Sequence, residues 1–327
     1  MHHQTPRAGP SPFAFADDAL PRLLAALRTR EYRFTVVTPA THGSVNARPE
    51  NFMARNVRDV FGWSRPFTRD VLDPELFGLA AQAGVLTPLY GGTAPSWRST
   101  VRVATLDGQL FLHSAYPTKA PDAVFFGPDT YRFAAALRRH LATRGTAVRR
   151  AIDIGCGSGA AGILIALAHP AAEVVLTDIN ASALVVASIN AVAAGVPNTV
   201  CRCSDLFASV AGPFDLIMAN PPYLMDPSAR AYRHGGGALG EALSIRILQG
   251  ALPNLTPGGS LVLYTGSAIV DGHDHVRSAA EAVLAGSGLA WRYEELDPDV
   301  FGEELADGAY RETDRIAAVL LIVERPG

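Results

Sequence analysis

The amino-acid sequence predicts an α/β protein in which the second half of the chain folds into a seven-stranded, doubly wound sheet. From residue 150 onward, short apolar strands alternate with Ala-rich helical segments, and a glycine-rich turn joins the first strand to the first helix. The length of 327 residues is about twice that of a usual single domain. This length leaves room for a smaller N-terminal α+β domain.

Most strands of the predicted sheet are apolar runs rich in Val, Ile and Leu. Such runs are typical of strands that are buried on both faces of a parallel sheet. We expect them at 151–154, 173–177, 199–203, 215–219, 260–265, 289–295 and 316–324. Together with the intervening helices they form a Rossmann-like domain that covers residues 146–327.

The N-terminal part shows helical periodicity followed by strand alternation. Apolar residues recur at helical spacing over 17–28 and over 74–84, and 99–114 alternates around Asp107-Gly108, a strong hairpin signal. Helix followed by hairpin suggests a winged-helix-like unit, although a structural cap on the larger domain explains the pattern as well and is the preferred interpretation. We therefore expect an accessory or substrate domain over 16–145, preceded by a polar, Pro-rich and flexible segment over 1–15.

Charge and cysteine content limit the function classes. The formal net charge is −3, so no global positive field attracts the protein to nucleic acid or to an anionic membrane. The three cysteines are an odd number without metal-type spacing, which supports neither a disulfide framework nor a zinc site. No apolar stretch reaches membrane-spanning length, and the N-terminus lacks a signal-peptide pattern. We expect a cytoplasmic protein without a metal.

The segment "AIDIGCGSGAAG" predicts a site for a nucleoside-containing cofactor. It places Asp153 at the end of a strand and then Gly155, Gly157 and Gly159, which let the backbone turn sharply and a ligand approach closely. The next strand ends at Asp178, about twenty residues past the last glycine, where a carboxylate accepts hydrogen bonds from a ribose diol. Taken alone, the glycine turn also fits nicotinamide or flavin binding.

A third strand ends in "CRCSDLF". Asp205 at its carboxyl end is placed to accept a hydrogen bond from an adenine amino group, while Leu206 or Phe207 packs on the ring. Each acid alone is also compatible with an ordinary helix cap. Acids at two successive strand ends, after a glycine turn, favour the cofactor site.

The fourth strand, "FDLIMA", runs directly into Asn220-Pro221-Pro222-Tyr223. The side-chain oxygen of Asn220 and the carbonyl of Pro221 are acceptors that can both bind a target NH₂ group, and the two prolines fix the backbone between them. Tyr223 can stack on a flat conjugated group and orient its nitrogen. The tetrapeptide predicts chemistry on a planar nitrogen.

In this order and spacing, "DIGCGSG", "TDIN", "SDLF" and "NPPY" resemble the class I S-adenosylmethionine-dependent methyltransferases. The tetrapeptide is similar to that of the release-factor glutamine methyltransferases and of the enzymes that methylate exocyclic amino groups of adenine and guanine. The resemblance implies that 146–327 is a methyltransferase domain with S-adenosyl-L-methionine as its cofactor. The methyl group would go to a protein glutamine amide or to the exocyclic amino group of a base.

The segment "FFGPDTYRF" resembles the stretch before the sheet that helps to hold the cofactor in the glutamine methyltransferases. That similarity implies that Phe126, Asp129, Thr130 and Arg132 line the methionine end. Besides Arg132, the cofactor-binding residues implied are Phe126, Asp129, Thr130, Asp153, Gly155, Cys156, Gly157, Gly159, Asp178, Ile179, Asn180, Ser204, Asp205, Leu206 and Asn220. The catalytic residues are Asn220, Pro221, Pro222 and Tyr223.

Three further segments have less definite roles. The glycines of "YRHGGGALGEALSIRIL" permit a lid over an acceptor pocket. The acidic "DPDVFGEEL" suits either the sheet edge or the closing of the pocket. His273-Asp274-His275 suggests a metal site or, preferably, the polar start of a helix.

The sequence is compatible with several functions. The acceptor is a protein, a nucleic acid or a small metabolite. The same fold also serves small-molecule biosynthetic methyltransferases and cyclases that consume S-adenosylmethionine without transferring its methyl group. A cofactor-binding protein without catalysis and a nicotinamide dehydrogenase are weaker alternatives, because neither gives a role to Asn220 through Tyr223.

Overall fold

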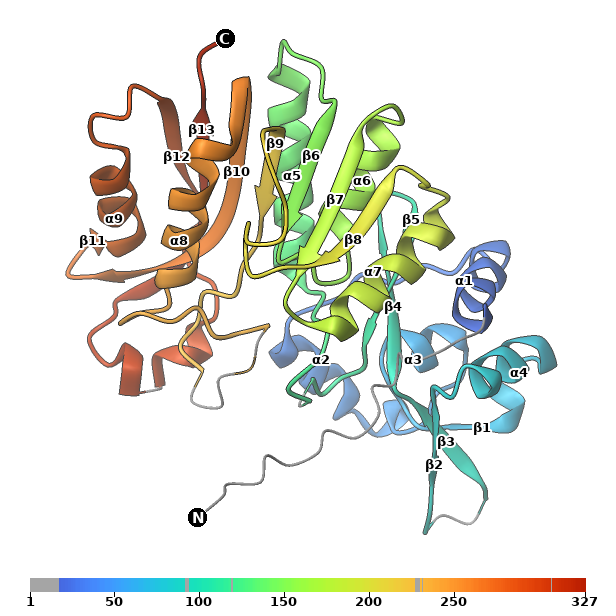
Figure 1. Ribbon diagram of the computed structural model, residues 1–327. Helices are drawn as coiled ribbons and strands as arrows, with labels where there is room; N and C mark the ends of the chain where they lie inside the picture. The colour runs from blue at the N-terminus through green and yellow to red at the C-terminus, as the bar shows by residue number, and fades with distance from the viewer. Residues whose placement is uncertain (1–17, 92–93, 119, 227–229, 231, 307) are drawn as a thin grey trace, which may run out of the picture.

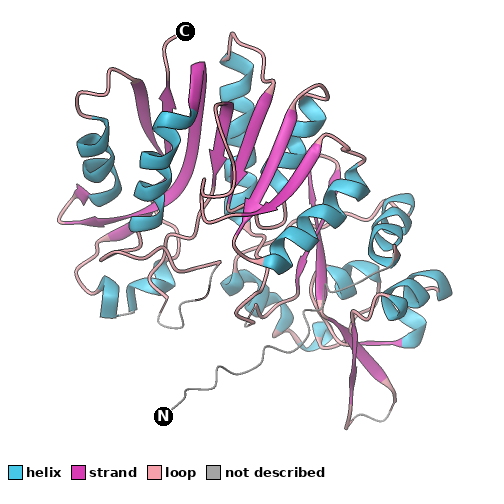
Figure 2. Cartoon of the chain, in the orientation of Figure 1, coloured by secondary structure: helices cyan, strands magenta, loops and turns pink. Residues whose placement is uncertain are grey.

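A computed structural model describes residues 18–91, 94–118, 120–226, 230, 232–306 and 308–327 (Figure 1). The segment 1–15, expected to be flexible, lies outside these residues. Within them the chain forms one large sheet covered by helices, and a smaller group of helices and short strands from the N-terminal part (Figure 2).

The large sheet contains all seven strands that the sequence predicts. In spatial order they are β12 (Ala290–Asp297), β13 (Arg315–Glu324), β10 (Leu255–Val270), β9 (Phe214–Ala219), β6 (Arg150–Ile154), β7 (Glu173–Asp178) and β8 (Thr199–Cys203), and the short β11 (His273–Asp274) pairs with β10. From β10 to β8 the neighbours are parallel, whereas β13 is antiparallel to both β10 and β12. The strand order reverses between β6 and β9, and open α/β sheets bind ligands at such a reversal.

Helices cover both faces of this sheet, as expected for a doubly wound fold. Strand residues alternate between two hydrophobic clusters, so that Ala151 lies in one and Ile152 in the other. On the first face lie α5 (Pro128–Thr143), α6 (Ala160–Ala168) and α7 (Ala181–Ala194), and on the second α8 (Ala242–Ala251) and α9 (His275–Leu284). The predicted fold class is therefore confirmed.

The N-terminal part contains the helices and the hairpin that the sequence predicts. Its helices are α1 (Ala19–Thr29), α2 (Pro39–Asn46), α3 (Val57–Phe61) and α4 (Pro74–Gln82), with the 3-10 turns Pro49–Asn51 and Arg69–Val71. The hairpin joins β4 (Val101–Leu106) to β5 (Gln109–Ser114), and Asp107 and Gly108 at its turn both have positive φ. A three-stranded sheet of β1 (Phe67–Thr68), β3 (Ser96–Ser99) and β2 (Leu86–Leu89) was not predicted.

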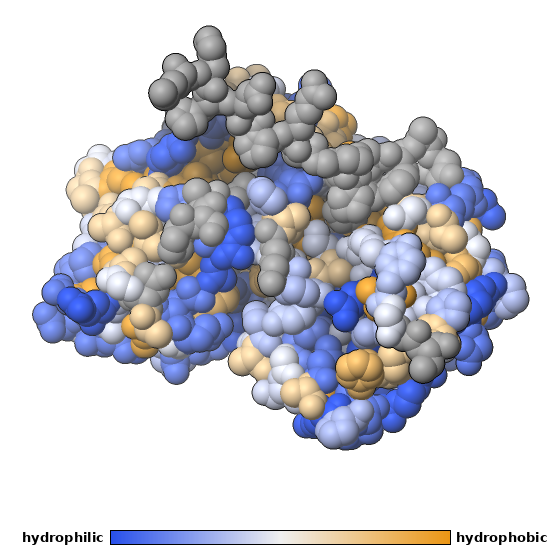
Figure 3. All heavy atoms as spheres, turned by 90° about the horizontal axis from the view of Figure 1, so that it is seen from below, coloured by the Kyte–Doolittle hydropathy of each residue, from blue (hydrophilic) through white to orange (hydrophobic). Residues whose placement is uncertain are grey.

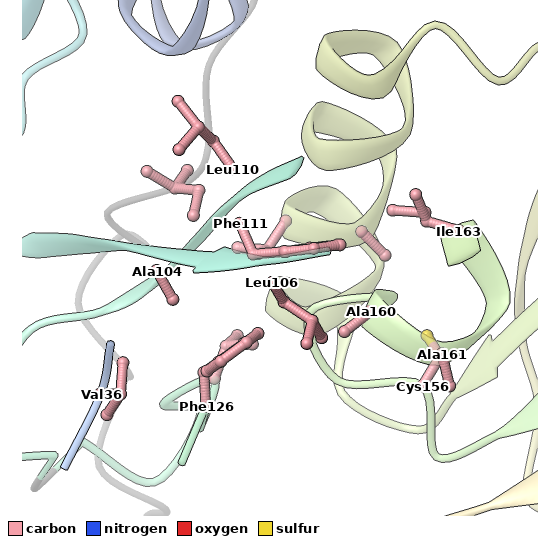
Figure 4. Packing of buried hydrophobic residues seen from close by; sticks show 14 of the residues in the cluster. Val36, Ala104, Leu106, Leu110, Phe111, Phe126, Cys156, Ala160, Ala161 and Ile163 are labelled. Carbon is pink, nitrogen blue, oxygen red and sulfur yellow. The ribbon is translucent and has the colours of Figure 1, made fainter. Parts of the chain in front are cut away.

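The hairpin packs on the large domain through α7. Asn190 of α7 is fully buried, and its amide accepts from the backbone nitrogen of Leu112 at 2.8 Å and donates to the carbonyl of Leu112 at 3.0 Å. The same amide donates to the carbonyl of Ser158 in the glycine-rich turn. Figure 4 shows Leu106 and Phe111 of the hairpin beside Ala160 at the start of α6. One continuous core thus connects the hairpin to the turn that follows β6.

The polar segment 273–275 begins α9. The side chain of Asp274 accepts a hydrogen bond of 2.8 Å from the backbone nitrogen of Arg277, which is an ordinary helix cap. The preferred interpretation of this segment as a helix start is confirmed. In the described part of the chain, no three His, Cys, Asp or Glu side chains are grouped as metal ligands, and no helix has the length and apolar character needed to cross a membrane.

Candidate active site

A cavity of about 420 Å³ lies at the carboxyl ends of β6, β7, β8 and β9, where the strand order reverses. This volume falls within the range of small-molecule sites, roughly 300–1,000 Å³. Figure 3 views the molecule from below, toward the end at which the parallel strands terminate, and hydrophilic and hydrophobic residues are mixed on this face.

The glycine-rich turn forms the floor of the cavity. Gly155 and Gly157 have φ of +67° and +53°, and a Cβ added to either would meet nothing within 4 Å. Since both glycines line the cavity, the open space beside their backbone belongs to it. A ligand can therefore approach this turn at backbone distance.

Asp153 ties the turn to α6. Its Oδ2 accepts a hydrogen bond of 2.9 Å from the backbone nitrogen of Gly162, and its carboxyl group is almost fully buried. Burial raises the pKa of Asp153 to about 7, because the charged form loses its hydration, and the nearby Asp178 acts in the same direction.

Asp178 ends β7 at the edge of the cavity. Its Oδ2 accepts from the backbone nitrogen of Gly157 at 3.0 Å, and its Oδ1 accepts from the backbone nitrogen of Asn180 at 2.9 Å. Burial raises its pKa, although these two hydrogen bonds oppose the shift. A carboxylate has about four acceptor positions, so this one retains capacity for a hydroxyl pair.

The third strand end places a polar and an apolar group together. Asp205 is exposed and accepts from Arg246 at 3.4 Å, while Leu206 has a φ of 51° and accepts, through its carbonyl, from the hydroxyl of Ser204 at 2.9 Å. Ser204 itself is buried and holds the turn. Asn180 has a structural task, because its side chain accepts from the backbone nitrogen of Ser182 and so caps α7.

The tetrapeptide Asn220 to Tyr223 follows β9 and lines the same cavity. Tyr223 is buried, and its hydroxyl donates a hydrogen bond of 2.6 Å to Oδ2 of Asp129. Its ring lies against the backbone of Gly266 and meets the ring of Phe301 edge-on, with centroids 5.8 Å apart. Burial raises the pKa of Tyr223 well above its usual value, and the adjacent Asp129 adds to the rise. Its phenol is therefore a neutral donor.

The cavity brings together nearly all of the site residues expected from the sequence. The lining set contains Asp129, Thr130, Asp153, Gly155, Cys156, Gly157, Asp178, Ile179, Asn180, Ser204, Asp205, Leu206, Asn220, Pro221, Pro222 and Tyr223. Three expected residues, Phe126, Gly159 and Arg132, do not line it. Phe126 is buried in the core and stacks on Phe111 with ring centroids 5.8 Å apart, and its neighbour Phe125 lines the cavity instead. Gly159 caps the start of α6.

The guanidinium group of Arg132 binds two carboxylates of the protein itself. Its guanidinium donates to Asp129 at 2.9 Å and to Asp297 at 2.7 Å, and it does not line the cavity. The expectation that Arg132 lines the methionine end is thus not met by its position. Arg132 instead connects the first turn of α5 to the end of β12.

Two lining residues from the N-terminal part, Pro39 and Tyr116, were not foreseen. Tyr232 belongs to the glycine-rich segment after the tetrapeptide, which was expected at the acceptor pocket, and it lines the cavity. The hydroxyl of Tyr232 donates to the carbonyl of Thr118 at 2.7 Å, which joins these two walls. The acidic segment 297–305 lies at both of the positions considered for it, because Asp297 ends the edge strand β12 and Phe301 lines the cavity.

Comparisons with known proteins support this description. Residues 122–271 match the model of the methyltransferase small domain. The release factor glutamine methyltransferase of Bordetella pertussis is 33% identical over 217 residues, which are 63% of this chain and 76% of that protein. The ribosomal protein uL3 glutamine methyltransferase of the same organism is 40% identical over 36% of this chain and 44% of that protein. The ribosomal RNA small subunit methyltransferase C of Mannheimia succiniciproducens is 40% identical over 34% of this chain and 30% of that protein.

The doubly wound sheet, the glycine turn and the tetrapeptide after β9 define an enzyme of the methyltransferase class. More specifically, the chain belongs to the class I S-adenosylmethionine-dependent methyltransferases, in the group of the release factor glutamine methyltransferases. The expected enzyme class and cofactor are confirmed, and the dehydrogenase alternative is set aside. The chain spans about three quarters of the first relative but less than half of the other two.

Proposed function

We propose that this enzyme transfers the methyl group of S-adenosylmethionine to the side-chain amide nitrogen of a glutamine in a protein. The observation that carries the proposal is the position of Asn220 to Tyr223, which line one cavity with Asp178 and the glycine turn. Two relatives carry the name of glutamine methyltransferases, acting on a release factor and on a ribosomal protein. Their names agree with an acceptor nitrogen that is planar and conjugated.

The cavity fits the cofactor. Asp178 supplies acceptors for the ribose hydroxyls, Gly155 and Gly157 leave room beside the backbone, and Asp205 with Leu206 suits an adenine. When bound, the cofactor supplies a methyl group made electrophilic by its sulfonium. The protein has to hold that group and the acceptor close together.

The acceptor amide is held by two oxygens. The side-chain oxygen of Asn220 and the carbonyl of Pro221 accept one hydrogen bond each from the NH₂ group, which favours the pyramidal form of its nitrogen. The nitrogen lone pair then forms a bond to the methyl carbon while the bond from that carbon to sulfur breaks. The nitrogen releases one proton to water afterwards, so no strong base is needed, and proximity and orientation provide most of the acceleration.

The N-terminal part forms one wall of the acceptor side. Pro39 and Tyr116 line the cavity, and Thr118 holds Tyr232 across it. We assign to residues 16–145 the role of a substrate domain that selects the acceptor, with 146–327 as the catalytic domain. Selection by a second part of the chain would explain how one fold serves different acceptors.

A second candidate acceptor is the exocyclic amino group of a base. The rings of Tyr116, Phe125 and Tyr232 all line the cavity, and aromatic rings stack well on bases. One relative is named as a ribosomal RNA methyltransferase. Charge argues against a long nucleic acid, because the net charge is −3 and, among the residues that the structure describes, the two arginines lining the cavity are paired: Arg230 with Asp226 and Arg233 with Glu304.

We place the enzyme in the cytoplasm. Cys156, Cys201 and Cys203 are all free thiols, as is usual where the compartment is reducing. Glutamine-containing acceptors of the translation machinery are found in the same compartment.

The proposal is tested with cofactor labelled in its methyl group. The purified enzyme is incubated separately with release factors and ribosomal proteins, with total RNA, and with a metabolite extract, and Asn220→Ala serves as the inactive control. Label on a glutamine of a protein, absent with the control, is the expected result. Label on RNA or on a metabolite instead would move the acceptor to the other class, and cofactor breakdown without labelled product would indicate a cyclase.

A further inference from the structure

The carboxylate of Asp129 is shared by three donors from three separate elements. Oδ2 accepts from the hydroxyl of Tyr223 at 2.6 Å, and Oδ1 accepts from the hydroxyl of Tyr264 on β10 at 2.7 Å. Arg132, one turn further along α5, donates to the same Oδ1 at 2.9 Å. Asp129 is 4% exposed, so these contacts are made away from solvent. Charge-assisted hydrogen bonds of this kind are among the strong ones in proteins.

Tyr223 is held on its other sides as well. A Cβ at Gly266 would come within 2.3 Å of Cδ2 of Tyr223, so the ring lies directly on the backbone of β10. Phe301 meets the ring at an interplanar angle of 74°. The ring is thus confined by Gly266 and Phe301, and its hydroxyl is held by Asp129.

We infer that Asp129 is a positioning residue, which acts through Tyr223 by fixing the ring of that tyrosine against the acceptor side of the cavity. The inference rests on the proposed function and adds to it a residue outside the tetrapeptide. It differs from the role implied by the family resemblance, in which Asp129 binds the methionine end of the cofactor. Three of the about four acceptor positions of its carboxylate are already taken by protein donors.

A positioning role and a cofactor-binding role for Asp129 predict different effects of its substitution. If Asp129 acts through Tyr223, then Asp129→Ala and Tyr223→Phe should lower turnover to a similar extent, and the double variant should lose little more. If Asp129 binds the cofactor, then its loss should weaken cofactor affinity and add fully to the effect of Tyr223→Phe. Tyr264→Phe is the matched control. It removes one hydroxyl that donates to the same carboxylate, and Tyr264 does not line the cavity.

The position of Tyr223 can be followed without any acceptor. In protein labelled with 3-fluorotyrosine, the ¹⁹F resonance of Tyr223 is the one missing from Tyr223→Phe. We expect Asp129→Ala to shift or broaden this resonance and Tyr264→Phe to leave it in place. An unchanged Tyr223 resonance in Asp129→Ala would overturn the inference. Should the alanine variant fail to fold, Asp129→Asn carries the test, since its amide accepts from only one of the two phenols.

The kinetic readout uses an acceptor that the wild type methylates. We expect Asp129→Ala to lower kcat at least about tenfold and to leave the affinity for S-adenosylhomocysteine within about threefold. We expect Asp129→Asn to recover part of this loss. A loss of cofactor affinity with an unshifted Tyr223 resonance would assign Asp129 to the cofactor instead. If the wild type methylates no acceptor, the proposed function fails, while the ¹⁹F resonance still decides whether Asp129 holds the ring.

Discussion

The backbone nitrogen of Gly157 donates a hydrogen bond of 3.0 Å to Oδ2 of Asp178, which ties the turn after β6 to the end of β7. The two segments are neighbours because β6 and β7 pair in parallel and end at the same edge of the sheet. One carboxylate therefore supports the glycine turn and faces the cavity at the same time. Cofactor binding should depend on both roles.

Asp178→Ala should weaken the binding of S-adenosylhomocysteine by about 10- to 100-fold, which corresponds to hydrogen bonds to one charged group. The variant loses the acceptor for ribose and also leaves the nitrogens of Gly157 and Asn180 without their partner. Calorimetric titration measures the change. Glu312→Ala, which removes an exposed carboxylate outside the cavity lining, is the control, and wild-type affinity in Asp178→Ala would contradict the assignment.

Asn220→Ala should separate catalysis from cofactor binding. Removing the side-chain oxygen takes away one of the two acceptors for the target NH₂ group, so turnover should fall at least about 100-fold. Affinity for S-adenosylhomocysteine should stay within about threefold, because the ribose acceptor Asp178 is untouched. Labelled methyl transfer and calorimetry on the same preparation test both statements, and near wild-type turnover would exclude the orienting role.

Gly266→Ala should displace Tyr223. The added methyl would overlap Cδ2 of the ring, which is too close for any real contact, so either the ring or β10 has to move. We expect overpacking to lower the free energy of unfolding by about 1–3 kcal/mol. We also expect turnover to fall, because the ring of Tyr223 is displaced. Gly78→Ala is the control, since an added Cβ there meets nothing within 4 Å. Full activity of the Gly266 variant would show that the place of the ring is unimportant.

Asp153 should make stability depend on pH. Burial raises its pKa in the fold from the ordinary value of 3.8 to about 7, so between these pH values the folded state keeps a proton that the unfolded state has lost. The contribution of Asp153 to stability should therefore fall as the pH rises from about 4 to about 7 and level off above it, whereas His42 and His140, whose pKa values burial lowers to about 4, contribute in the opposite direction. Asp153→Asn, which keeps an acceptor for Gly162, should gain at least about 1 kcal/mol relative to the wild type over this range. Thermal unfolding of both proteins at several pH values measures it, and parallel curves would exclude the effect.

Tyr116→Ala should affect the acceptor rather than the cofactor. Tyr116 lines the cavity from the N-terminal part, and its ring packs on that of His42 with centroids 4.2 Å apart. We expect the KM for the acceptor to rise about tenfold while the affinity for S-adenosylhomocysteine stays the same. Tyr90→Ala, at a tyrosine that is 91% exposed, is the control. An unchanged KM would contradict a role of the N-terminal part in selecting the acceptor.

The large sheet could be predicted because its inner strands, such as β9 and β13, are continuous apolar runs that are buried in the fold. Each of the seven segments lies where it was expected, and the difference is largest for β10, predicted at 260–265 and observed at Leu255–Val270. At the carboxyl end the extra residues pair with β13, up to Ile269 opposite Arg315, and at the amino end Leu255 pairs with Phe214 of β9. Such pairing partners lie far apart in the chain, so the local pattern does not report them.

The sequence predicts those site residues that lie at the ends of strands. Parallel strands terminate at one edge, so Asp178, Asp205 and Asn220 had to meet there. The walls contributed by loops could not be predicted in this way, because contacts such as that of Tyr232 with Thr118 fix them. The same holds for Asp129, whose sequence context indicated a cofactor contact and whose carboxylate binds Tyr223.

The central claim, that the cavity after β6 to β9 binds S-adenosylmethionine for methyl transfer, is tested most directly by calorimetric titration of the wild type with S-adenosylhomocysteine, beside a nicotinamide dinucleotide. We predict saturable binding of the former at micromolar affinity or better and no binding of the latter. Binding should weaken in Asp178→Ala. Absence of binding to S-adenosylhomocysteine, or preference for the dinucleotide, would contradict the account.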